Sequence, residues 1–179
     1  AENLMMRAFL AVLSLMISFS AFAATPWNQW QQVGRATLSW GPFEVYHSQL
    51  LTPDGKYQAG KWPQALKIEY LRSIDHQELT KATEEQWQAL GLLAQAQKNG
   101  WLEAVQNTWP DVSNGSEIMF VATENGGQFY SQPANSVLST PVGQPFSPAF
   151  RDAFLAIWLS PATQYPDLRS KLIGASASD

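Results

Sequence analysis

The chain has 179 residues, of which 45% are hydrophobic and 15% charged, and its formal net charge is −4. This acidic balance excludes the basic surface typical of nucleic-acid binding, so no nucleic-acid partner is predicted. The chain has no cysteine and only two histidines, which excludes disulfides and leaves too few of the ligands that zinc prefers. A P-loop, a G-x-G-x-x-G turn and a G-x-S-x-G elbow are also missing from the sequence, so neither a metal nor a cofactor is predicted.

The N-terminal stretch MMRAFLAVLSLMISFSAFAA has the pattern of a cleavable secretion signal: one positive residue, Arg7, then an apolar run and a small-residue A-x-A site. Residues 1–4 precede the double Met and are set aside as extraneous. Cleavage after Ala23 would leave residues 24–179 as a single domain in the periplasm. A membrane anchor is the alternative, but the apolar run is shorter than the roughly 20 residues that a spanning helix needs. No stable membrane span is therefore expected after cleavage.

The segment from Arg35 to His47 reads as two strands that fold back at Gly41-Pro42. Because side chains alternate along a strand, the length of the turn decides which residues share a face. A three-residue turn puts Arg35 opposite His47 on one face. A two-residue turn puts His47 opposite Ala36, so that Arg35 and His47 separate. Apolar patterning favours the second register, because it aligns the apolar residues of the two arms.

The middle of the chain predicts one strand followed by helices. ALKIEYLRSI alternates as a half-buried strand does, and the pattern changes to helix from Ser73. Thr83 and Gln86 have the spacing of a capping box, and an apolar stripe containing Trp87 and Trp101 follows at helical spacing. Asn99-Gly100 is expected to divide this segment into two helices. His76 is expected to be a solvated residue at a helix start.

The last third predicts more strands and two helices. SEIMFVATENGGQFYSQ reads as strand, turn and strand, and SVLSTPVG as a further short strand. Ser147-Pro148 begins a helix that buries Phe150 and its apolar neighbours while Arg151 and Asp152 point elsewhere. A short helix runs from Pro166 to Leu172 and ends at Gly174. The fold class predicted is α+β, with an antiparallel sheet and helices packed on one face.

Three segments together resemble bacterial chalcone isomerase-like proteins: WPQALKIEYLRSIDHQELTKATEEQWQALG, WPDVSNGSEIMFVA and AFRDAFLAIWLSPATQYPDLRSKLIG. They occur in the same order and at similar spacing across nearly all of the chain after the signal. The resemblance implies an open-faced β-sandwich with a layer of helices and a ligand cleft between sheet and helices. It also favours the three-residue turn, because that family brings both equivalent hairpin positions into its cleft.

The resemblance to the plant isomerases implies where catalytic residues would lie. The arginine on the first core strand is present as Arg35, whereas His47 stands in place of the hydroxyl on the next strand. The helix tyrosine falls at about Glu78 or Leu79. The neighbouring asparagine falls near Glu85, and the C-terminal hydroxyl near Ala156. Most catalytic positions are therefore replaced, and only the arginine is kept.

An arginine without hydroxyl partners can still bind an anion, because its guanidinium matches a carboxylate. The function predicted is a non-catalytic periplasmic binder of an apolar carboxylate such as a fatty acid. The candidate ligand-binding residues are Arg35, His47, Tyr46, Glu78 and Leu79. An ordinary exposed arginine, in water or paired with Glu44, is the alternative for Arg35.

Two other functions remain open. An isomerase or lyase would use Arg35 with His47 as general base, because an imidazole titrates near neutrality. A carbohydrate or envelope-protein interaction module is suggested by the eight tryptophans. Trp87, Trp101 and Trp158 are expected in the core because their spacing is helical. The tryptophans left for such a module are Trp27, Trp30, Trp40 and Trp62.

Overall fold

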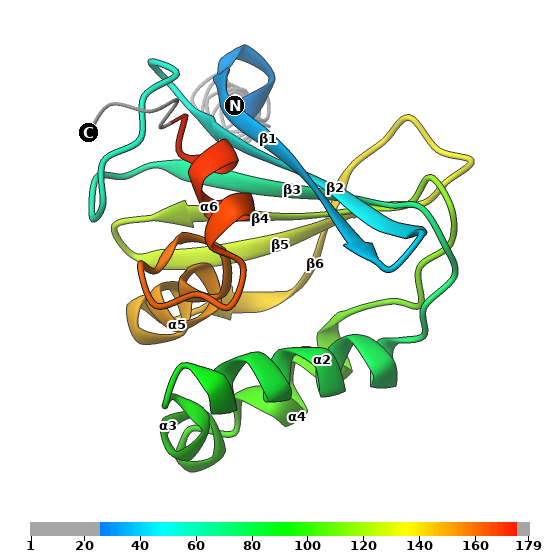
Figure 1. The fold of residues 1–179 in the computed structure, drawn as a ribbon, viewed down its shortest axis with the longest axis vertical. Coiled ribbons are helices and arrows are strands. Elements are labelled where there is room, and N and C mark those ends of the chain that lie inside the picture. Colours follow the sequence, from blue (N-terminus) through cyan, green and yellow to red (C-terminus); the bar gives the residue numbers. More distant parts are fainter. Residues whose placement is uncertain (1–25, 175–179) are drawn as a thin grey trace, which may run out of the picture.

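The computed structural model of the chain describes residues 26–174 and shows an α+β fold, as predicted from the strand and helix patterns. Six antiparallel strands form one open sheet in which neighbours in sequence are neighbours in space (Figure 1). The predicted secretion signal, residues 1–23, lies outside the described residues. Within residues 26–174, no helix is long and apolar enough to cross a membrane.

The strands are β1 (Gln31–Trp40), β2 (Phe43–Thr52), β3 (Gln64–Tyr70), β4 (Glu117–Thr123), β5 (Gly126–Gln132) and β6 (Thr140–Phe146). The helices are the 3-10 helix η2 (Pro26–Gln29), then α2 (His76–Ala89), α3 (Leu93–Lys98), α4 (Trp101–Thr108), α5 (Pro148–Leu159) and α6 (Pro166–Leu172). One face of the sheet shares the main core with helices α2 to α6, and the other face carries a small cluster around Trp27 of η2. We call these the inner and the outer face.

The β1–β2 hairpin turns on two residues, and the three-residue turn expected from the sequence is wrong. Trp40 pairs with Phe43, and Gly41 has φ 58°, a value that glycine accepts without strain. The register then shifts at Val45, so that Leu38 pairs with Tyr46. This bulge inserts one residue into β2 and reverses the direction of every β2 side chain beyond it.

The middle segment contains three helices where two were expected. The capping box predicted at Thr83 is wrong, because Thr83 lies inside α2 and its hydroxyl donates to the Leu79 carbonyl. The chain breaks twice, at Gly91 and at Gly100, and both glycines have positive φ. Both breaks are therefore of the kind that glycine permits at a helix end.

The start of α2 is fixed from two sides. The Asp75 side chain accepts a hydrogen bond from the Glu78 backbone N–H at 2.8 Å, which caps the helix. Asp111 accepts from the His76 backbone N–H at 2.8 Å, and its Oδ1 also lies 2.6 Å from His76 Nδ1. His76 is thus a half-buried anchor and not the solvated residue expected from the sequence. These contacts hold α2 against the segment that follows α4.

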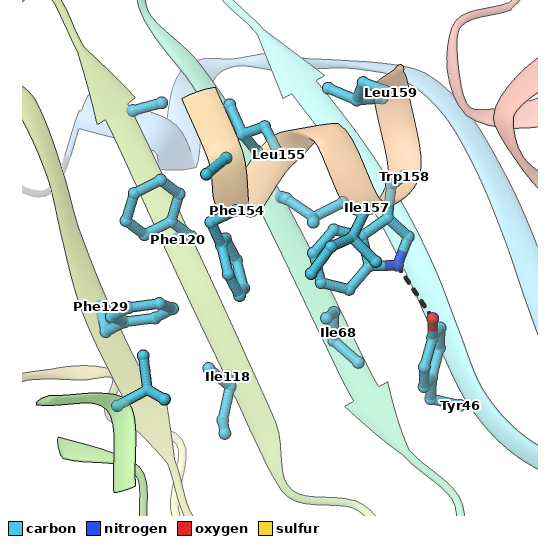
Figure 2. Packing of buried hydrophobic residues seen from close by; sticks show 14 of the residues in the cluster. Tyr46, Ile68, Ile118, Phe120, Phe129, Phe154, Leu155, Ile157, Trp158 and Leu159 are labelled. Atoms are coloured by element: carbon cyan, nitrogen blue, oxygen red, sulfur yellow. Dashed lines mark hydrogen bonds between the residues drawn. The ribbon is translucent and has the colours of Figure 1, made fainter. Parts of the chain in front are cut away.

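Helix α5 supplies the centre of the core, and its predicted N-terminal cap is confirmed. Ser147 Oγ accepts from the Phe150 N–H at 3.2 Å. The apolar side of α5, from Phe154 to Leu159, lies across β3 and β4 on the inner face (Figure 2). Trp87 and Trp101 are buried beside it, as the helical spacing predicted.

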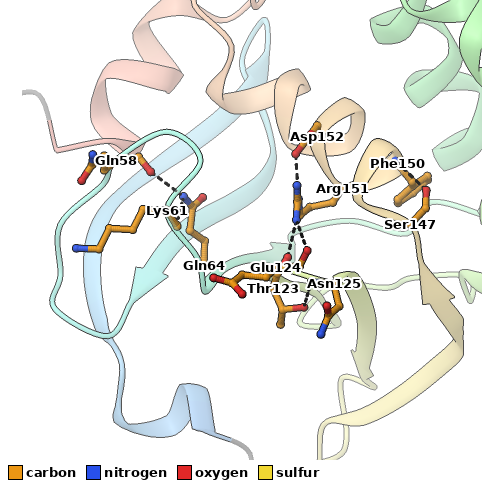
Figure 3. A network of polar contacts seen from close by, with 10 residues as sticks. All are labelled: Gln58, Lys61, Gln64, Thr123, Glu124, Asn125, Ser147, Phe150, Arg151 and Asp152. Carbon is orange, nitrogen blue, oxygen red and sulfur yellow. Dashed lines mark hydrogen bonds and ion pairs between the residues drawn. The ribbon is translucent and has the colours of Figure 1, made fainter.

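Arg151 is buried, which corrects the expectation that it points away from the core. Its Nη1 donates to the carbonyl oxygens of Thr123 and Glu124 at 2.6 and 3.2 Å, and its Nε donates to Asp152 (Figure 3). The guanidinium also lies 4.0 Å from the ring centre of Trp62. Arg151 therefore ties α5 to the end of β4 and to the loop before β3.

Replacing Arg151 with leucine is expected to lower the free energy of unfolding by about 2–4 kcal/mol, because the buried guanidinium loses its hydrogen bonds to two carbonyls and its contact with Trp62. Urea unfolding measures the change. The matched control is Asp152→Asn, whose side chain is 63% exposed and which should change stability by about 0.5 kcal/mol or less. Equal losses in both variants would contradict the role given to the guanidinium.

Candidate functional site

A cavity of about 420 Å³ lies between the inner face of the sheet and the helices. This volume is within the range of small-molecule sites, about 300–1,000 Å³. Strands β1 to β4 form one wall, α2 and α5 form the other, and side chains from the adjoining loops close the ends. The apolar lining consists of Leu38, Trp40, Val45, Ile68, Ile74, Leu79, Ala82, Ile118, Phe154 and Ile157.

Two tyrosines bring polar atoms into this apolar wall. The bulge at Val45 turns Tyr46 to the inner face, where its hydroxyl accepts a hydrogen bond from Trp158 Nε1 at 2.9 Å (Figure 2). Tyr70 of β3 meets Tyr46 edge to face, with ring centres 6.1 Å apart. Both rings are more than nine-tenths buried and line the cavity.

Burial raises the pKa of Tyr46 and of Tyr70 well above the ordinary tyrosine value, since the charged form would lose its hydration. The hydrogen bond from Trp158 opposes this shift at Tyr46, and the neighbouring Tyr46 adds to it at Tyr70. Both groups are therefore neutral hydroxyls at physiological pH. They can donate and accept hydrogen bonds, but neither is poised as a base.

Alkaline titration should distinguish Tyr46 and Tyr70 from the other three tyrosines. Since the folded pKa is raised, the stability from each group is complete below the unfolded pKa of about 10 and is lost as the pH rises through the folded value. We expect tyrosinate absorbance to report three ionisations while the fold is intact, and two more only as it unfolds. Ionisation of all five tyrosines with unchanged circular dichroism would contradict the burial.

Two further polar atoms of the lining have no partner. Trp109 Nε1 and Gln86 Oε1 are buried and make no hydrogen bond with the described residues. Both residues line the cavity, and Trp109 is 7% exposed. Gln86 is held through its other amide atom, Nε2, which donates to the Tyr165 hydroxyl at 3.1 Å. Each of the two atoms has less than 1 Å² of accessible surface, so other protein atoms cover them and neither faces the cavity.

The opening of the cavity carries one cation and two carboxylates. Arg72, Glu78 and Glu85 are exposed and belong to its lining. Arg72 forms no ion pair with the described residues, and its guanidinium lies 6.0 Å from the ring centre of Phe43. Ser73 adds a hydroxyl next to this cation. The rim therefore offers one guanidinium with unused donors.

The expectation that Arg35 reaches the cleft is wrong. Arg35 pairs with Gln49 in the β1–β2 ladder, its side chain is exposed on the outer face, and it does not line the cavity. His47 pairs with Thr37 and lies on the same outer face, with its Nδ1 2.7 Å from Thr37 Oγ1. The two residues do share a face, but it is the face away from the cavity: alternation along β1 places Arg35 there, and the bulge at Val45 moves His47 to the same face. Arg35 is instead the ordinary exposed arginine of the alternative, and it forms no ion pair with Glu44.

The other three predicted site residues, Tyr46, Glu78 and Leu79, line the cavity. Arg72 and Trp109 also line the cavity and were not predicted as site residues. Arg72 lies near the C-terminal end of the segment predicted to be a half-buried strand, which is where a sheet edge exposes charged side chains to a cleft. Trp109 continues the four-residue spacing of Trp101 and Val105, so the pattern groups it with the core and gives no signal that it would line a cavity.

The structure gives little support to a site of exposed tryptophans. Among the four that sequence left for such a site, only Trp40 is exposed, at 53%. Trp27 is buried, with its ring centre 4.4 Å from that of Tyr130. A second hollow on the outer face is bordered by Trp27, Trp30 and the ion pair of Lys67 with Glu117. Trp27 serves there as part of the small outer cluster.

Fold and site together define an α+β protein with an open antiparallel sheet and a mostly apolar cavity beneath its helices. The chain is 30% identical over 164 residues to a protein of Haemophilus influenzae described as uncharacterized, covering 92% of this chain and 77% of that protein. The chain belongs to the same family as this Haemophilus influenzae protein. No profile of a known protein family matches the chain.

Proposed function

We propose that this protein binds an apolar carboxylate, such as a fatty acid, in the cavity between sheet and helices, and that it does so in the periplasm. The observation that carries the proposal is an open, mainly apolar cavity with an unpaired guanidinium at its rim. The apolar lining would hold the chain of the ligand, since burying it removes apolar surface from water. Arg72 would bind the carboxylate, taking the role that the sequence assigned to Arg35.

The charges at the rim restrict where an anion can lie. Glu78 and Glu85 are seven residues apart on α2, which separates them by about 10 Å along the helix. A ligand carboxylate would be repelled by either glutamate and attracted by Arg72. The arrangement therefore favours one orientation, with the carboxylate at Arg72 and the chain directed inward past Leu79.

Binding without turnover agrees best with the side chains of the cavity. Its lining contains no histidine, and the buried tyrosines are held neutral. The isomerase alternative needs Arg35 and His47 around a substrate, yet neither residue lines the cavity. Membership of the chalcone isomerase-like proteins remains part of this proposal, supported by the sheet with helices on one face and the cavity between them.

The proposal is tested by titrating the protein, from residue 24 onward, with saturated fatty acids of increasing length in a calorimeter. We expect one-to-one binding that strengthens with chain length until the cavity is full, because each buried CH₂ adds about 0.8 kcal/mol. No binding by any chain length, together with no rise in melting temperature, would overturn the proposal.

Replacing Arg72 with glutamine should weaken fatty-acid binding by about tenfold, because a charge-assisted hydrogen bond contributes about 1.5 kcal/mol or slightly more. The affinity for the fatty alcohol of equal length should not change. Arg35→Gln is the matched control, since Arg35 is exposed on the outer face of the same sheet. If Arg35→Gln weakened binding and Arg72→Gln did not, the head-group assignment would be reversed.

A further inference from the structure

Two hydroxyls of the cavity lining hold protons that no described residue accepts. The Tyr70 hydroxyl makes no hydrogen bond with the described residues, and Tyr46 accepts from Trp158 while its own proton stays unused. These two side chains are 6% and 8% exposed. Both belong to the lining of one cavity, and their ring centres lie 6.1 Å apart.

A simple fatty acid would not satisfy these donors. Its only polar group is the carboxylate, which the proposed orientation leaves at Arg72 on the rim. The hydrocarbon chain would then lie against two hydroxyls that had lost water and gained no partner. Leaving a buried donor unpaired is costly, and native proteins satisfy nearly all such groups.

We propose that the preferred ligand carries a second oxygen along its chain, as in an oxo- or hydroxy-substituted fatty acid, and that the hydroxyls of Tyr70 and Tyr46 donate to this oxygen. This inference rests on the proposed function and names its ligand class. An oxo oxygen accepts up to two hydrogen bonds and needs no acceptor from the protein. A ligand hydroxyl would accept from the same two donors.

Neutral donors suit this oxygen better than charged ones. The raised pKa values of Tyr46 and Tyr70 keep both hydroxyls protonated, so each can donate without a buried charge. In an apolar surrounding such hydrogen bonds are stronger than in water, and a ligand that lacks the oxygen leaves the donors unpaired. The unsubstituted fatty acid should therefore bind more weakly than the apolar area it buries would suggest.

The test compares an eighteen-carbon fatty acid with its oxo and hydroxy derivatives, substituted at successive positions, by calorimetry on the wild-type chain from residue 24. We expect at least about a tenfold tighter binding of the best oxo derivative, because one hydrogen bond made in place of an unpaired donor has that effect. If the plain acid binds as tightly as every derivative, the inference is overturned while the proposed function stands. If none of the acids binds, the proposed function itself fails.

One variant assigns the effect to a named donor. Tyr70→Phe keeps the ring and removes the hydroxyl, so it should reduce the preference for the oxo acid to about threefold or less, in part because the plain acid no longer leaves that donor unpaired and binds more tightly. Trp101→Phe is the matched control, because Trp101 is buried but does not line the cavity. An unchanged preference in the Tyr70→Phe variant would overturn the assignment of this donor.

Discussion

Replacing Phe150 with alanine is expected to lower the free energy of unfolding by about 3–5 kcal/mol, the range observed for large aromatic residues in a closed core. Phe150 is fully buried. Its ring stacks on that of Phe146 at 4.0 Å and meets the rings of Trp101 and Phe154 at 5.6 and 5.7 Å. The residue therefore joins α5 to β6 and to α4, and the cavity left by its removal has no neighbour free to fill it.

Chemical denaturation of the Phe150→Ala variant measures this loss. The matched control is Phe43→Ala, because the Phe43 side chain is 63% exposed at the tip of the β1–β2 hairpin. We expect the control to cost about 1 kcal/mol or less. Comparable losses in the two variants would mean that the aromatic cluster around α5 is not the centre of the core.

Replacing Leu79 with tryptophan is expected to abolish fatty-acid binding while the protein stays folded. Leu79 is half-buried on α2 and lines the cavity, so a larger side chain can extend into space that is empty of protein atoms. An indole in that space would occupy the position of several methylene groups of the ligand. A loss of affinity of about a hundredfold or more follows if even four methylenes are excluded, at about 0.8 kcal/mol each.

The control for this variant is Leu102→Trp. Leu102 is also half-buried, on α4, and packs against the same core, but it does not line the cavity. We expect binding by the Leu102 variant to match the wild type within about threefold, and its melting temperature to fall at least as much as that of the Leu79 variant. Retained binding in the Leu79 variant would place the ligand elsewhere on the molecule.

Local signals in the sequence predicted most strands and the C-terminal helices correctly. Ser147-Pro148 and Gly174 bound the last helical region because their backbone preferences are local, and β4 and β5 meet at a tight glycine-containing turn as predicted. The strand expected at residues 136–143 instead begins at Thr140, since Ser136 and Leu138 hydrogen-bond within the preceding loop. Such loop contacts leave no periodic signal.

The hairpin shows why the site could not be predicted from pattern alone. Alternation predicts a face only while the register is continuous, and the extra residue at Val45 breaks it. Val45 is buried like its neighbour Tyr46, so the sequence around it offers no polar residue to mark the bulge. One inserted residue therefore moves His47 to the outer face, and Arg35 lies there with it.

The buried arginine and the unpaired tryptophan are harder still to predict. The burial of Arg151 depends on two carbonyls at the end of β4 and on Trp62, which are distant in sequence. Whether the Trp109 indole N–H finds an acceptor depends on the packing of the whole structure and not on any one segment of the sequence. The sequence predicts a cleft through a family resemblance, whereas only the packing shows which side chains line it.

Native mass spectrometry of the protein mixed with an equimolar saturated fatty acid tests the central claim most directly, when wild type and Leu79→Trp are compared. If the cavity beneath the helices holds an apolar carboxylate, the wild type will retain one fatty acid per chain and the variant none. Wild-type protein that retains no fatty acid, or a variant that retains as much as the wild type, would contradict it.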